Sequence, residues 1–130
     1  MSDELEINIE KQIVYWREGA LEAMDTASYL IKGGRISLGL FAAHLALEKI
    51  LKAHVCRKKQ NTPPRIHNLT RLAELAELTL SDDHKASLAA MNEFQLEGRY
   101  PDMLMPPPTL DETKKYLERS KAVFEWLINQ

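Results

Sequence analysis

Three side chains that can take part in chemistry lie at intervals of four residues in the segment from Ile36 to Lys58. They are His44, Glu48 and Lys52. Because a helix brings positions four apart onto one side, these side chains are expected to form a single stripe. One interpretation is structural: Glu48 and Lys52 form an ion pair in the favourable order, and His44 hydrogen-bonds a neighbour. The other is the wall of a polar cleft, in which Lys52 contacts a phosphate and His44 or Glu48 acts as a base or contacts a ribose.

A fourth candidate is a histidine that stands just before a predicted helix start, in the string Pro-Arg-Ile-His-Asn at positions 64–68. The first backbone N–H groups of a helix are free to bind anions, so His67 is well placed to help hold one. The alternative is that His67 or Asn68 only caps the helix.

The string Arg-Tyr-Pro-Asp at positions 99–102 adds the last candidates. The guanidinium of Arg99 offers a planar fork for a phosphate or carboxylate, and Tyr100 offers a face on which a base can stack. The alternative is that Arg99 and Asp102 form ion pairs with the helices and hold this proline-rich segment in place.

Most enzyme signatures are absent from the chain. It has no glycine-rich phosphate loop, no H-E-x-x-H motif, no zinc spacing of Cys and His, and no G-x-S-x-G motif. His44 and Glu48 alone are too few ligands to predict a metal site. The single cysteine, Cys56, cannot form an internal disulfide and is expected to be a small core or surface residue.

The elements that position these residues are all predicted to be helices. Apolar residues recur at threes and fours, and no segment alternates as a strand does. The predicted helices span residues 5–32, 36–58, 68–78 and 82–96, and a last one opens at a T-x-x-E capping box at Thr109. Gly33 and Gly34 are expected to end the first helix, Gly19 to allow a neighbouring helix to approach closely, and residues 98–108 to form an extended strap. The prediction is an all-α, five-helix antiparallel up-and-down bundle.

Composition limits the possible classes of protein. The 130 residues suit a single domain, 1–130, and the net charge of −2 gives no general attraction to nucleic acid or anionic lipid. The longest apolar run, Leu38 to Ala43, is far shorter than the roughly 20 residues that cross a membrane. The acidic N-terminal segment has no apolar signal-peptide core, so we expect a cytoplasmic protein without membrane contact.

Three strings in the same chain resemble a known family. The sequence AAHLALEKILKAHV at 42–55, the P-x-R-I-H-N-L turn at 63–69 and R-Y-P-D before the last helix together resemble the HEPN domains of bacteria and archaea. The resemblance implies an all-α bundle that forms a homodimer, a nucleotide ligand, and a small nucleotidyltransferase partner in a toxin–antitoxin pair. The residues that match the family pattern are Glu48, Lys52, His67, Arg99, Tyr100 and Asp102.

One departure bears on activity. Many HEPN proteins are metal-independent RNases with an arginine followed, after four to six residues, by a histidine. Here Arg35 precedes His44 with eight residues between, and Arg57 precedes His67 with nine. Arg65 precedes His67 with one residue between. None of these spacings fits, so the sequence disfavours nuclease activity.

Three functions remain open. The favoured one is a non-catalytic subunit that binds a nucleotide, without a cofactor or metal, beside its nucleotidyltransferase partner. The runner-up is an RNA endonuclease toxin acting as a dimer, with His67 or His44 as general acid or base and Arg99 stabilising the phosphorane. The third is a purely structural adaptor. For the dimer interface, the apolar residues 103–105 are candidates. The favoured function requires that the stripe and the Arg99–Tyr100 segment share one cleft.

Overall fold

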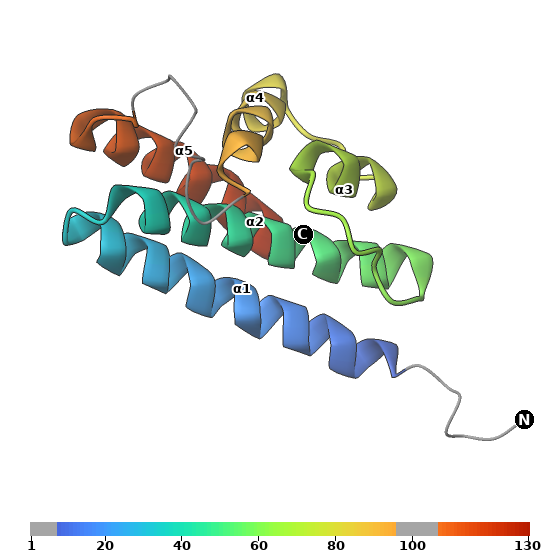
Figure 1. The fold of residues 1–130 in the computed structure, drawn as a ribbon. Coiled ribbons are helices and arrows are strands. Elements are labelled where there is room, and N and C mark those ends of the chain that lie inside the picture. The colour runs from blue at the N-terminus through green and yellow to red at the C-terminus, as the bar shows by residue number, and fades with distance from the viewer. Residues whose placement is uncertain (1–7, 96–106) are drawn as a thin grey trace, which may run out of the picture.

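The computed structural model describes residues 8–95 and 107–130, and in these ranges the chain is helical without a strand. The helices are α1 (Ile9–Lys32), α2 (Ile36–Lys59), α3 (Leu69–Leu75), α4 (Asp82–Met91), the 3-10 helix η2 (Asn92–Phe94) and α5 (Leu110–Ile128). Figure 1 shows α1 and α2 side by side as two long rods, with the shorter α3 and α4 lying along the other side of α2. The predicted all-α, five-helix antiparallel bundle is confirmed.

Helix α2 is the centre of the bundle. Its apolar residues lie nearly all round the helix, and α1, α3, α4 and α5 all pack against it. The connection from α1 is only Gly33–Arg35, in which Gly34 takes the left-handed conformation with φ 78°. This short reversal makes α1 and α2 antiparallel neighbours, so residues near the start of α1 face residues near the end of α2.

Helix boundaries follow the capping side chains, and three predicted boundaries were wrong. Helix α1 begins at Ile9 rather than at residue 5, because Asn8 is extended and its side chain accepts a hydrogen bond from the Lys11 N–H. Helix α3 ends at Leu75 rather than 78, since Glu77 is left-handed with φ 54°. Helix α4 ends at Met91 and tightens into η2 instead of continuing to residue 96.

Helix α5 is fixed at both ends by hydrogen bonds. Its start carries the predicted capping box, in which Thr109 and Glu112 bond each other's backbone N–H groups, and these bonds lower the pKa of Glu112. Near its end, His54 Nε2 donates to the Leu127 carbonyl at 2.7 Å. Arg17 Nη1 donates to the Ile128 carbonyl at 2.9 Å. Side chains of α1 and α2 therefore satisfy carbonyls that have no partner within α5.

Within residues 8–95 and 107–130, no helix is both long and apolar enough to cross a membrane.

Candidate functional site

The stripe predicted on α2 exists, and it is buried. His44, Glu48 and Lys52 are all at most 6% exposed. The Lys52 ammonium donates to Glu48 Oε2 at 3.0 Å, so the pair is formed as the spacing predicts. A buried ion pair requires further hydrogen bonds to offset the cost of removing both charges from water. The Glu48 carboxylate finds its second partner on the segment that follows α2.

That second partner is His67, which precedes α3. Its Nδ1 lies 3.0 Å from Glu48 Oε1. Because a carboxylate only accepts, Nδ1 must carry a proton and donate it. The His67 side chain is 61% exposed, whereas that of Glu48 is 8% exposed. His67 is therefore the exposed edge of the group.

The backbone beneath His67 is fixed as well. His44 Nε2 lies 3.1 Å from the His67 carbonyl oxygen, which requires Nε2 to be the protonated nitrogen of His44. The side chain of Asn68 caps α3 by accepting from the Arg71 N–H. Asn68 therefore performs the capping role considered for this turn, and His67 is directed to Glu48. Two residues of the α2 stripe therefore hold His67: Glu48 bonds its ring, and His44 bonds its carbonyl.

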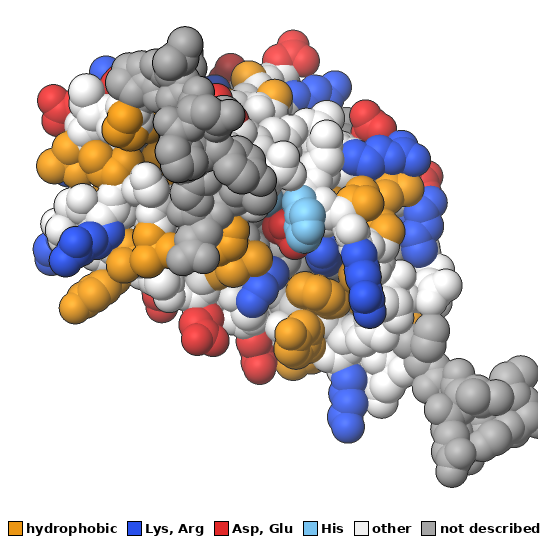
Figure 2. Space-filling model, in the orientation of Figure 1, with side chains coloured by type: hydrophobic (Ala, Val, Ile, Leu, Met, Phe, Trp, Pro, Cys, Tyr) orange, Lys and Arg blue, Asp and Glu red, His pale blue; other side chains and the backbone are white. Residues whose placement is uncertain are grey.

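Helix α1 closes the group on its other side. The Lys52 ammonium lies 5.3 Å from the ring centroid of Trp16, at the distance of a cation–π contact. Lys52 is thus held between a carboxylate and an indole, and its charge balances that of Glu48. We call His44, Glu48, Lys52 and His67 the α2 cluster. Figure 2 shows a histidine side chain at the surface directly beside an acidic one, with basic and apolar side chains gathered next to them over α1 and α2.

The other predicted site residues lie outside the described residues. These are Arg99, Tyr100 and Asp102, together with the predicted interface segment 103–105. Of the seven predicted site residues, the structure brings four into contact, namely His44, Glu48, Lys52 and His67. Sequence reasoning did not single out Lys49, which follows Glu48 on α2, or Tyr15, whose ring packs on that of Trp16 on α1. Within the described ranges no three His, Cys, Asp or Glu side chains are grouped as metal ligands.

Comparison with known proteins decides the family. A sequence profile of the HEPN domain matches residues 13–130. The chain belongs to the HEPN domain family. A search of curated proteins found no match.

Two crystal structures share the HEPN fold of this chain. TT1696 from Thermus thermophilus superposes with a TM-score of 0.74 and 21% identity, covering 89% of this chain and 95% of that one. ST0689, an archaeal HEPN homologue, gives a TM-score of 0.70 and 20% identity, with coverage of 91% and 96%. At these identities the likeness concerns the fold alone.

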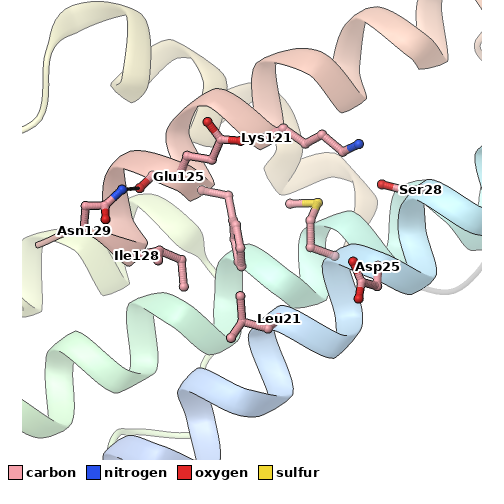
Figure 3. Close-up of a pocket in the computed structure, with 9 residues that line it drawn as sticks. Leu21, Asp25, Ser28, Lys121, Glu125, Ile128 and Asn129 are labelled. Carbon is pink, nitrogen blue, oxygen red and sulfur yellow. Dashed lines mark hydrogen bonds between the residues drawn. The ribbon is translucent and has the colours of Figure 1, made fainter.

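This HEPN chain also has a hollow between α1 and α5, of about 330 Å³, that shares no lining residue with the α2 cluster. Figure 3 shows Leu21 of α1 and Ile128 of α5, two of its apolar lining residues. Its charged lining residues are Asp25, Glu125 and Lys121. Two acids and one base do not favour an anionic ligand in this hollow.

Two buried histidines make the stability of the HEPN bundle depend on pH. Burial lowers the pKa of His44 and of His54 below the ordinary value of 6.5. Between the depressed and the ordinary pKa the unfolded chain binds more protons, so stability is full above about 6.5 and falls as the pH drops. We expect a slope of up to about 1.4 kcal/mol per pH unit for each histidine.

Urea unfolding measured from about pH 8 down to about pH 5 checks this expectation. The variant His54→Gln keeps a donor for the Leu127 carbonyl and cannot gain a proton, so its profile should be less steep. A wild-type free energy of unfolding that stayed constant over this range would contradict the assignment.

Proposed function

We propose that this HEPN protein is a non-catalytic helical subunit that binds a nucleotide at the α2 cluster, beside a small nucleotidyltransferase partner. The observation that carries the proposal is the geometry of His67. Its ring is oriented by a buried carboxylate, and its side chain is largely exposed. Because Nδ1 donates to Glu48, Nε2 of the neutral ring can accept from a ribose hydroxyl, and Nε2 of the protonated ring can donate to a phosphate oxygen.

Electrostatics support the same choice. An isolated Glu48 carboxylate beneath the surface would repel a phosphate, but the Lys52 ammonium 3.0 Å away balances its charge. Lys52 is nearly buried and held by Glu48, so its role in the proposal is to neutralise and position the carboxylate. His67 is then the residue of the cluster that contacts the ligand, and His44 and Glu48 are positioning residues.

The most direct test is the replacement of His67 by alanine. We expect it to weaken nucleotide binding about tenfold or more, because a hydrogen bond to a charged group contributes about 1.5–3 kcal/mol. Isothermal titration with ATP, GTP, CTP and UTP measures the change. His84 provides the control, since its ring lies against Trp126 outside the cluster. His84→Ala should bind as the wild type does. Flat heats for every nucleotide, or equal heats for wild type and His67→Ala, would refute the proposal.

The same pair of proteins distinguishes the alternative function. An imidazole oriented by a carboxylate is also suited to proton transfer, so His67 fits a general acid or base of an RNA endonuclease. Labelled RNA incubated in EDTA with wild type and with His67→Ala gives the answer. Cleavage by the wild type alone would replace the binding role with a nuclease role.

The proposed partners can be tested on the purified protein. Homodimerisation predicts a mass near twice 14.9 kDa by light scattering. Partnership with a nucleotidyltransferase predicts that the product of an adjoining gene of that type copurifies with this chain. A monomeric mass by light scattering, together with purification of this chain without a nucleotidyltransferase, would refute the assembly part of the proposal. The nucleotide part would then depend on the titrations alone.

A further inference from the structure

An exposed aromatic pair adjoins the α2 cluster. Tyr15 is 64% exposed, and its ring packs edge-to-face on Trp16 with centroids 5.1 Å apart at 79°. The ring of Trp16 carries the Lys52 ammonium 5.3 Å from its centroid. A continuous series of contacts therefore runs from Tyr15 through Trp16, Lys52 and Glu48 to His67.

The same surface has a second lysine, Lys49. A Cβ placed on Gly19 would lie 3.1 Å from Lys49 Cδ and 3.2 Å from Lys49 Nζ. Gly19 therefore gives the Lys49 side chain room to lie across α1, one helical turn beyond Tyr15 and Trp16. Among the described residues Lys49 forms no salt bridge. Lys52 is paired with Glu48, whereas the ammonium of Lys49 is paired with no carboxylate of the described residues.

We propose that Tyr15, backed by Trp16, is the platform on which the base of the nucleotide stacks, with Lys49 contacting its phosphates. The inference rests on the proposed nucleotide-binding function and adds the ligand's orientation to it. Every base has a π face, so an exposed aromatic ring supports a base of any identity. Tyr15 is the better platform, because Trp16 already has Lys52 over its ring.

Tyr29 provides a matched control on the same helix. It is a tyrosine, it is 81% exposed, and it lies fourteen residues beyond Tyr15, on a similar side of α1. At about 1.5 Å of rise per residue it is about 21 Å away along the axis. A general effect of removing a surface tyrosine would appear equally at both positions, whereas base stacking would appear at Tyr15 alone.

The experiment uses the full chain with Trp126→Phe, so that Trp16 is the only tryptophan and its fluorescence reports on this surface. ATP and inorganic tripolyphosphate are the two probes. We expect ATP to quench the fluorescence of Trp16, and tripolyphosphate to quench that fluorescence less. Tyr15→Leu should weaken ATP binding about fivefold or more and leave tripolyphosphate binding unchanged. Tyr15→Phe, which keeps the ring, and Tyr29→Leu should both bind ATP normally.

A charge variant completes the test. Lys49→Gln should weaken the binding of both ATP and tripolyphosphate. Lys115→Gln removes a cation from a separate hollow on α5 and should weaken the binding of neither. If ATP binds and depends on His67 but Tyr15→Leu has no effect, the stacking inference is wrong and the proposed function stands. If neither probe binds the wild type, the proposed function fails and the inference fails with it.

Discussion

Replacement of Glu48 by leucine is expected to lower the free energy of unfolding by about 3–5 kcal/mol, the cost of leaving a buried charge without its partner. The Lys52 ammonium would lose its carboxylate at 3.0 Å and retain only the indole of Trp16. His67 would lose the acceptor of its Nδ1 proton at the same time. Urea unfolding measures the first effect, and titration with ATP measures the second.

The double variant Glu48→Leu/Lys52→Met separates stability from binding. Replacing both members of a buried ion pair by apolar residues of similar size is often neutral or stabilising. We therefore expect the double variant to unfold near the wild-type urea concentration and still to bind ATP poorly, because nothing orients His67. The structural-adaptor hypothesis predicts instead that the double variant keeps its partner binding and changes only in melting.

An exposed ion pair gives the control for this experiment. Arg71 and Glu74 lie 3.0 Å apart on α3, with both side chains more than half exposed. Pairs of this kind contribute little to stability, because water screens them. Glu74→Ala should therefore leave both the unfolding midpoint and ATP binding close to wild type. A loss as large as that of Glu48→Leu would show that burial is not what makes the Glu48 pair important.

The contrast between these two pairs shows what sequence could predict. Helical period and capping residues predicted α2, the stripe upon it and the caps Asn68 and Thr109, because these depend on residues three or four apart. The sequence could not show that the loop returns His67 to Glu48. That contact joins two segments through a loop whose path depends on how α3 packs against α2.

Local sequence was also insufficient for residues whose surroundings come from another helix. Lys49 has no distinctive neighbours along the chain, and it becomes a candidate only because Gly19 of α1 lies opposite. In the sequence Tyr15 is an ordinary tyrosine, and it becomes a candidate only because the neighbouring Trp16 contacts Lys52 in the structure. The one local signal was Gly19 itself, which predicted a close approach but not which side chain would use it.

Gly39 shows a still closer approach, and its replacement by alanine is expected to destabilise the bundle by about 1–3 kcal/mol through overpacking. A Cβ at this position would lie 2.5 Å from Ile31 Cγ1 and 3.3 Å from the Ile31 backbone nitrogen. Alanine favours a helix by up to about 1 kcal/mol over glycine, so the clash must outweigh that gain. Gly19→Ala is the matched control. Its Cβ meets only the flexible Lys49 side chain, so stability should be unchanged or rise.

A double-mutant cycle assigns the cost to the contact itself. Ile31→Ala alone is expected to destabilise by about 2–5 kcal/mol, since it empties space beside a nearly buried position. In the double variant the new methyl group at position 39 enters that space, because Ile31 Cγ1 is the atom it would otherwise strike. The double variant should therefore be more stable than the sum of the two single changes predicts, by at least about 0.5 kcal/mol. Strict additivity would mean that α1 and α2 separate to admit the methyl group, and that the close fit of this hairpin does not determine the stability of the bundle.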